Sequence, residues 1–313
     1  MSPPTAVVLR DLGLGDLLVA VPALRLLRRA LPDHEIVLVA PAALAPVVSL
    51  ISAVDTHVSG IPGDSREFRS HAPDVAVNLH GKGPESHARL EALAPRRRIG
   101  HAAPGWEGPA WTDDPARPER RRWCDLLVHA GLAADADPDD LHLPGRRAVP
   151  GGPVVVHPGA AYGSKRWPAA RFAVCAAVLQ AQGHAVVVTG GADEARLTAE
   201  VVARAGLPAD ADLGGRTDLA GLLDLVAAAS LVIAGDTGIS HVATAFGTPS
   251  VTLFGPVPAT QWGPPPGGPH VVLVDDTVRR GERFADDPDP ALLAVTPEDV
   301  LAALPSPHGI VPA

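Results

Sequence analysis

Three glycine-containing loops of the sequence carry charged or hydroxyl side chains, and each loop directly follows an apolar run. They are residues 11–16 (DLGLGD), residues 157–168 (HPGAAYGSKRWP) and residues 235–241 (GDTGISH). Glycines let another molecule approach the backbone closely, and a helix that begins after such a loop directs its N–H groups toward an anion. These loops are therefore the first candidates for a binding or catalytic site.

The loop at residues 157–168 is typical of a phosphate-binding loop. Gly159, Gly163 and Ser164 are expected to leave backbone N–H groups free before a helix, and Lys165 adds a mobile positive charge. The chain has only two lysines among its 26 basic residues, so a lysine here indicates a need for a compact ammonium group. No GxxxxGK[ST] pattern is present, so hydrolysis of a nucleoside triphosphate is not supported.

The loop at residues 235–241 also precedes a predicted helix. The N–H groups of Thr237, Gly238 and Ile239 are placed to hold the second phosphate of a diphosphate. Asp236 is expected to orient the loop by accepting hydrogen bonds from the backbone or from Thr237, or to bind a ligand hydroxyl. His241 is a candidate donor to a phosphate or a sugar. The alternative is that this segment only caps a helix.

Two carboxylates occupy similar positions elsewhere. Asp16 lies at the first turn of a predicted helix, and Glu194 follows the apolar run HAVVVT, where a carboxylate can bind the two hydroxyls of a ribose. For both residues the alternative is stabilisation of a helix N-terminus. A dinucleotide site at the first loop is disfavoured because Leu18 stands where GxGxxG requires a third glycine, and the next strand ends without an acidic residue.

Short apolar runs alternate with segments of helical periodicity, which predicts parallel sheets with helices on both faces. We expect strands at residues 5–10, 35–40, 74–79, 153–157, 184–189 and 230–234, and helices at 16–31, 218–229, 239–246 and from about 168, 192 and 296. The Pro/Gly/Arg-rich segment LPGRRAVPGG interrupts this alternation. It predicts an α/β chain with two doubly wound domains, 1–150 and 151–313, and a ligand at the carboxyl ends of their strands.

Composition limits the function further. The formal net charge of −9 argues against a nucleic-acid partner, and two distant cysteines without a CxxC pair give no support for a disulfide framework or a zinc site. Acidic DxD triplets at 135–137, 210–212 and 287–289 lie in Pro/Ala-rich connections, and we interpret all three as solvated loops rather than metal sites. No basic, apolar leader and no apolar run of about 18 residues is found, which favours a cytoplasmic protein.

The motifs resemble those of glycosyltransferase family 9, whose best-known members are the ADP-heptose:lipopolysaccharide heptosyltransferases. Four segments carry the resemblance: residues 12–32, 96–100, 157–168 and, most specifically, 235–264. It implies a GT-B fold, in which two Rossmann-like domains face each other across a cleft. The acceptor would bind the first domain and a nucleotide-sugar the second, with inversion at the transferred sugar and without a metal or other cofactor. The last helix, at about 296–304, is a candidate to pack back on the N-terminal domain.

The resemblance also implies roles for individual residues. Asp16 matches the proposed catalytic base of the family. The family's donor-binding positions match Lys165, Glu194, Asp236, Thr237, Gly238 and His241, and the loop chemistry adds Gly159 and Ser164 as donor-binding candidates. Acceptor-binding candidates are Gly15, His80 and Lys82, although His80 departs from the Leu-Gln-Gly that members often carry at this point.

The expected partners are a nucleotide-sugar, ADP-linked by resemblance, and a carbohydrate or other hydroxyl acceptor, with peripheral membrane contact if the acceptor is linked to a lipid. Alternatives are a nucleotide-sugar epimerase or hydrolase on the same fold, a non-catalytic nucleotide-sugar-binding protein, and an NAD-dependent enzyme.

Overall fold

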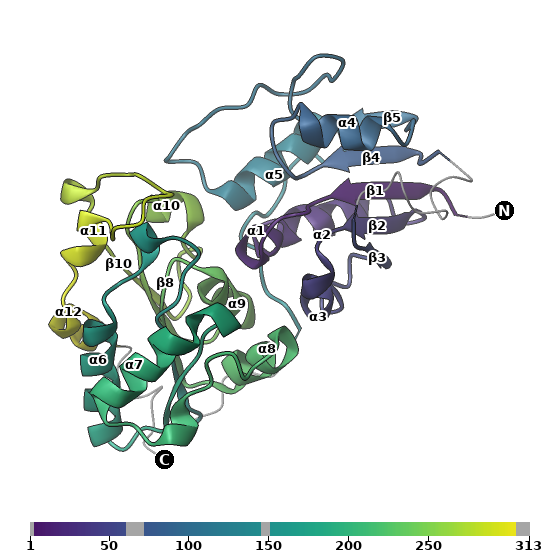
Figure 1. Ribbon diagram of the computed structural model, residues 1–313. Helices are drawn as coiled ribbons and strands as arrows, with labels where there is room; N and C mark the ends of the chain where they lie inside the picture. Colours follow the sequence, from purple (N-terminus) through teal and green to yellow (C-terminus); the bar gives the residue numbers. More distant parts are fainter. Residues whose placement is uncertain (1–2, 61–71, 145–150, 305–313) are drawn as a thin grey trace. The chain divides into compact units, whose positions relative to one another are not determined.

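The computed structural model describes residues 3–60, 72–144 and 151–304 of the chain (Figure 1). The chain forms two compact units, Met1–Leu141 (unit 1) and His142–Ala313 (unit 2). The domain boundary expected near residue 150 stays a prediction, because residues 145–150 lie outside the described part.

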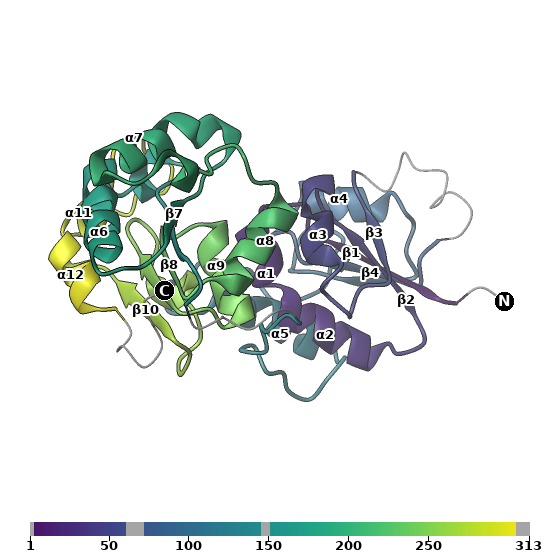
Figure 2. The same cartoon turned by 90° about the horizontal axis from the view of Figure 1, so that it is seen from below.

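Unit 1 contains a five-stranded sheet in the order β3-β2-β1-β4-β5, in which every pairing is parallel. The strands are β1 (Thr5–Leu9), β2 (Glu35–Val39), β3 (Thr56–Val58), β4 (Val75–Asn78) and β5 (Arg97–Ile99). The helices are α1 (Leu14–Leu18), α2 (Val21–Ala30), α3 (Ala45–Val48), α4 (Glu85–Glu91) and α5 (Glu119–His129), with a 3-10 turn η1 (Ala42–Leu44). Figure 2 shows α2 and α5 on one face of the sheet and α3 and α4 on the other.

Unit 2 repeats this plan with the order β10-β9-β8-β6-β7, again entirely parallel. Its strands are β6 (Val154–His157), β7 (Val186–Val188), β8 (Leu231–Gly235), β9 (Ser250–Leu253) and β10 (His270–Leu273). Its helices are α6 (Ala169–Ala181), α7 (Ala195–Ala205), α8 (Leu219–Ala228), α9 (Gly238–Phe246), α10 (Ala259–Trp262), α11 (Pro290–Leu293) and α12 (Pro297–Ala302). The 3-10 turns are η3 (Gly163–Lys165), η4 (Ala192–Glu194), η5 (Ala209–Ala211) and η6 (Asp276–Val278).

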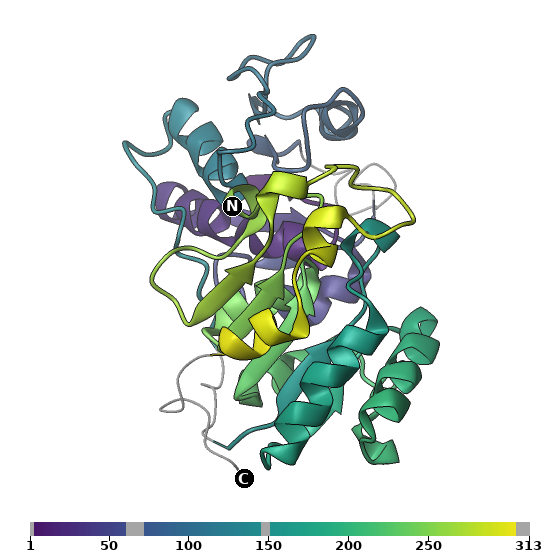
Figure 3. The same ribbon diagram turned by 90° about the vertical axis from the view of Figure 1, so that its left-hand side faces the viewer.

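The central strands are almost entirely buried because helices cover both faces of each sheet. Every residue of β4 and β8 is buried, as expected for strands in a covered parallel sheet. In unit 2, Trp167 and Phe172 pack edge to face on the sheet, and the Trp167 indole donates to the carbonyl of Val295 at 3.0 Å. Figure 3 shows α6 and α12, which are in contact, in front of this sheet.

The predicted elements agree with the structure in kind, with one clear correction. The expected single helix at residues 16–31 is two helices, α1 and α2, which are separated at Val19 and Ala20. Pro22 explains the break, because proline has no N–H group to continue a helix but is favoured in the first turn of a new one. The predicted last helix is present as α12, which begins at the N-cap Thr296. Its packing on the N-terminal domain stays a prediction.

Strand order identifies where each sheet can bind a ligand. In a doubly wound sheet, ligands bind outside the carboxyl ends of the strands, where the direction of winding reverses. In unit 1 this switch point lies between β1 and β4, and in unit 2 it lies between β6 and β8. The loops that follow these four strands therefore hold the strongest positions for a site in each unit.

Candidate functional site

Asp16 lies at the switch point of unit 1, in the first turn of α1. Its side chain is one third exposed, and Oδ1 lies 3.4 Å from Nη2 of Arg10. Nε of Arg10 also donates to the backbone carbonyl of Asp16 at 2.8 Å. A carboxylate held in this way, with one side open to solvent, can accept a proton from a bound hydroxyl.

The acceptor-binding candidates at the same switch point have different environments. His80 follows β4, and its backbone N–H donates to Oδ1 of Asn78 at 2.9 Å. Burial lowers the pKa of His80, and the nearby Arg89 and Arg10 lower it further, so its neutral form is favoured. Lys82 is exposed, and Gly15 lies within α1, where its carbonyl accepts from Val19.

Two residues that the sequence predicted as donor-binding meet at the switch point of unit 2. Nζ of Lys165, in the 3-10 turn after β6, lies 2.6 Å from Oδ2 of Asp236, the residue that follows β8. The Asp236 side chain is 5% exposed and that of Lys165 is 23% exposed, so the pair is partly shielded from water. This arrangement places one ammonium group, held by a buried carboxylate, at the carboxyl edge of the sheet.

The N-terminus of α9 lies beside this pair. Thr237 is its N-cap, in extended conformation, and Gly238 is its first residue. The alternative of simple side-chain capping is not what the structure has, because the N-cap makes no side-chain hydrogen bond and Asp236 instead contacts Lys165. His241 lies within the first turns of α9, with Nε2 4.0 Å from Oδ1 of Asp236. A nine-residue helix therefore directs its positive end toward the same edge as Lys165.

Two of the predicted donor-binding residues, Gly159 and Glu194, are also close together. A Cβ atom on Gly159 would lie 2.2 Å from the carboxylate carbon of Glu194, so the Glu194 side chain would have to move if this residue were larger. Oε2 of Glu194 accepts from the N–H of Gly191 at 2.8 Å and lies 4.0 Å from Nε2 of His157. Burial lowers the pKa of His157, and Glu194 opposes that shift. His157 was not predicted as a site residue, and its Nδ1 lies 2.9 Å from Oγ1 of Thr189.

Ser164 has a different environment from the one predicted. Its side chain is fully buried, its hydroxyl donates to the carbonyl of Arg283 at 2.7 Å, and its N–H donates to Ala285 at 2.8 Å. The expectation that the Ser164 N–H is free for a phosphate is therefore wrong. Ser164 joins the Lys165 turn to the segment before α11, where Asp289 is completely buried and accepts from three backbone N–H groups. The interpretation of residues 287–289 as a solvated loop is thus wrong for Asp289.

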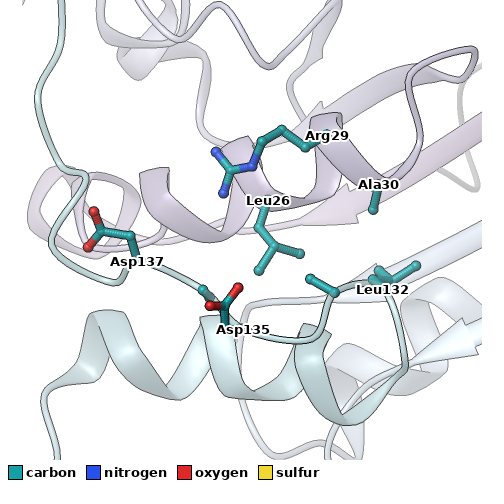
Figure 4. A pocket seen from close by; sticks show the side chains of 8 residues that line it. Leu26, Arg29, Ala30, Leu132, Asp135 and Asp137 are labelled. Carbon is teal, nitrogen blue, oxygen red and sulfur yellow. The ribbon is translucent and has the colours of Figure 1, made fainter.

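A surface hollow of unit 1 lies away from the carboxyl edge of its sheet. It is found at the C-terminal end of α2, which leads to the beginning of β2, and its volume is about 460 Å³ (Figure 4). The lining residues are Leu26, Arg29, Ala30, Leu132, Ala133, Asp135, Ala136 and Asp137. In the described part of the chain, no three His, Cys, Asp or Glu side chains are grouped as metal ligands would be.

The two switch points differ in charge and therefore in chemistry. Unit 1 presents a carboxylate, Asp16, that is supported by a buried guanidinium group. Unit 2 presents the ammonium group of Lys165 and the N-terminus of α9. The first arrangement suits proton removal from a hydroxyl group, and the second suits binding of an anion such as a diphosphate.

Comparison with known proteins relates part of the sequence to one family of transferases. Residues 132–278 match the model of glycosyltransferase family 9 (heptosyltransferase). Lipooligosaccharide heptosyltransferase 2 of Haemophilus influenzae is 32% identical over 158 residues, and lipopolysaccharide heptosyltransferase 2 of Escherichia coli is 33% identical over 155 residues. Each match covers 47% of this chain and 44% of the relative, so the chain is aligned with less than half the length of these relatives.

Solved structures extend the similarity of fold to nearly the whole chain. A glycosyltransferase of family 9 from Veillonella parvula gives a TM-score of 0.79 at 21% identity and covers 97% of both chains. E. coli ADP-heptose lipopolysaccharide heptosyltransferase II gives a TM-score of 0.77 at 23% identity, and the match covers 96% of this chain and 97% of that structure. E. coli heptosyltransferase WaaC with ADP gives a TM-score of 0.69 at 17% identity, and the match covers 95% of this chain and 98% of that structure. The two parallel-sheet units thus have the GT-B fold of family 9 structures. Within the described residues, no helix has the length and apolar character needed to cross a membrane.

Proposed function

Because residues 132–278 match the model of glycosyltransferase family 9, we propose that the protein is an inverting, metal-independent glycosyltransferase. It moves a heptose-like sugar from a nucleoside-diphosphate donor, ADP-linked, to a hydroxyl group of an acceptor. The observation that carries this proposal is the position of Lys165 and Asp236, which meet at 2.6 Å at the switch point of unit 2, beside the N-terminus of α9.

The donor binds unit 2 through its diphosphate. Lys165 and the N-terminal N–H groups of α9 supply positive charge, and His241 lies one turn further along that helix. Glu194, held beside Gly159, binds the ribose hydroxyls. ADP is the preferred carrier because solved relatives of the same fold are described as using ADP-heptose or were solved with ADP.

The transfer is a single displacement. Asp16 takes the proton of the acceptor hydroxyl while that oxygen forms a bond to the anomeric carbon, and the bond from this carbon to the diphosphate breaks. Proton removal by a positioned base typically contributes about 10²–10⁴-fold. Attack from the face opposite the leaving group inverts the configuration at the anomeric carbon.

The departing diphosphate leaves with additional negative charge. Lys165 and the positive end of α9 stabilise this charge because they are already directed toward it before the reaction. They take the place of the divalent ion that other transferases use. We therefore expect activity to persist in excess EDTA.

The acceptor binds unit 1 near Asp16, with Gly15, His80 and Lys82 as its candidate contacts. The relatives are named for lipooligosaccharide and lipopolysaccharide, so a glycan linked to a lipid is the acceptor class that we propose. Such an acceptor would bring the protein to the inner surface of a membrane from the cytoplasm. The reaction requires both units to hold their substrates at the same time.

Calorimetry with ADP, UDP, GDP and an ADP-linked heptose tests the donor assignment directly. We expect ADP and the ADP-sugar to bind more tightly than the other diphosphates, and Lys165→Ala to weaken both. Equal binding of the three diphosphates would contradict the ADP assignment, and unchanged binding by Lys165→Ala would remove this residue from the site. Turnover that does not depend on an acceptor would indicate an epimerase or hydrolase instead.

A further inference from the structure

We propose that Arg10 is a positioning residue that fixes the carboxylate and the backbone of Asp16 in the geometry needed for proton removal. This inference rests on the proposed function, because it assigns to Arg10 a role that is exerted through Asp16. Arg10 directly follows β1, and its side chain is only 1% exposed. Burial of a guanidinium group is costly unless most of its donors are satisfied, so its partners indicate what it does.

The Arg10 guanidinium spans three acceptors at the switch point of unit 1. Nε donates to the backbone carbonyl of Asp16 at 2.8 Å, and Nη2 lies 3.4 Å from Oδ1 of the same residue. Nη1 donates to the carbonyl of Leu79 at the end of β4. Because the guanidinium is planar and rigid, these contacts define the position of Asp16 relative to both central strands.

The planar face of the Arg10 guanidinium is also held in place. The guanidinium carbon of Arg10 lies 4.7 Å from the ring centroid of Trp123, a residue of α5 that is 1% exposed. Burial lowers the pKa of Arg10, whereas Asp16 and then Glu119 raise it, so two carboxylates favour the charged form. Arg10 is thus packed between an indole ring and the carboxylate of Asp16, with little freedom to move.

This arrangement leaves one oxygen of Asp16 for chemistry. Oδ1 is directed at Arg10, while among the described residues Oδ2 has no hydrogen-bond partner and the side chain is one third exposed. Arg10 itself is too buried to contact an acceptor and cannot act as a base, because its guanidinium stays protonated. Its effect must therefore pass through the position of Asp16, and through Leu79 to the adjoining His80.

Arg122 provides a matched control within the same unit. It is also 1% exposed, its Nε donates to Oε2 of Glu119 at 2.9 Å, and its Nη1 donates to the carbonyl of Thr112 at 2.9 Å. Its guanidinium carbon lies 4.1 Å from the ring centroid of Trp111. Loss of either arginine removes a buried guanidinium that is paired with a carboxylate, a carbonyl and an indole ring. Only Arg10 contacts Asp16.

The experiment compares Arg10→Met, Arg10→Lys and Arg122→Met by kcat, acceptor KM, ADP affinity and melting temperature. We expect Arg10→Met to lower kcat about 10²-fold, because small displacements of a catalytic group have effects of this size, with ADP affinity unchanged. Arg10→Lys should recover part of the loss, and Arg122→Met should lower the melting temperature similarly but keep kcat within a few-fold. Equal losses of kcat in Arg10→Met and Arg122→Met would overturn the inference.

A double-mutant cycle with Asp16→Asn keeps the test decisive. If Arg10 acts through Asp16, adding Arg10→Lys to Asp16→Asn causes little further loss of kcat, since the interaction has already been removed. Losses that multiply independently would overturn the inference, and this test does not require Arg10→Met to fold. If the wild type binds ADP and turns over, but the Arg10 variants keep its kcat, the role of Arg10 is refuted and the proposed function stands. A wild-type protein without ADP binding or turnover refutes the proposed function itself.

Discussion

Replacement of Lys165 by Met should weaken both the folded state of unit 2 and its binding of ADP, for two separable reasons. Methionine keeps the length of the side chain but removes the ammonium group that lies 2.6 Å from Asp236. The carboxylate of Asp236, 5% exposed, would then be buried without its cation. Loss of one partner of a fully buried pair typically costs 3–5 kcal/mol, and partial exposure of Lys165 reduces our expectation to about 2–3 kcal/mol.

The effect on ADP has a different origin. A hydrogen bond to a charged group contributes roughly 1.5–3 kcal/mol, so loss of the ammonium should weaken ADP binding by about 10–100-fold. Asp236→Asn in the Lys165→Met background removes the unpaired charge. It should restore most of the stability of unit 2 but should not restore ADP affinity.

Urea unfolding and calorimetry measure the two effects on the same variants. Arg166→Met is the matched control, because it removes a positive charge from the next residue, an exposed arginine that donates to the carbonyl of Ala160. This control should change ADP affinity by no more than a few-fold and the free energy of unfolding by no more than a few tenths of a kcal/mol. If Lys165→Met binds ADP as the wild type does, Lys165 has only a structural role and our account of the donor site is wrong.

Two further predictions concern pH and packing. Burial lowers the pKa of His101 to about 4 from an ordinary value of 6.5, so the folded state binds fewer protons than the unfolded state between these values. The free energy of unfolding of unit 1 should therefore fall by about 2 kcal/mol between pH 7 and pH 5. Urea unfolding of His101→Phe should show a smaller loss over the same range. Identical pH dependence of the two proteins would show that His101 is not the cause. Gly163→Ala would place a Cβ 1.5 Å from the backbone oxygen of Asp286, so we expect a lower melting temperature and weaker ADP binding, whereas a thermal shift equal to that of the wild type would contradict the packing of this turn.

Most of the buried strands and the edge strand β7 could be predicted from the sequence, whereas the edge strands β3, β5 and β10 and the central strand β9 were missed. β1, β4 and β8 are mainly apolar and are covered on both faces, and hydrophobicity alone identifies such runs. β5 is short and begins with two exposed arginines, and every residue of β3 is only partly buried, so neither has a strong pattern. The break between α1 and α2 was missed because the leucine periodicity continues past Pro22.

The sequence could indicate the candidate residues but not the contacts between them. Glycine loops before helices placed Lys165 and Asp236 in two separate loops, and only the strand order brings β6 and β8 together. Partners from distant parts of the chain were also invisible, as with Ser164 and Arg283, which are 119 residues apart. Arg10 was overlooked, although a charged residue directly after four buried strand residues is itself a signal of a specific partner.

The central claim is that Asp16 removes the proton from the acceptor hydroxyl while unit 2 holds the donor. Its most direct test is the turnover of Asp16→Asn, measured with donor and acceptor at saturation and accompanied by calorimetry with ADP. We predict a kcat lower by about 10²–10⁴-fold with ADP affinity unchanged, because asparagine keeps the shape of the side chain but cannot take the proton. A kcat within a few-fold of the wild type would contradict the assignment of Asp16 as the base.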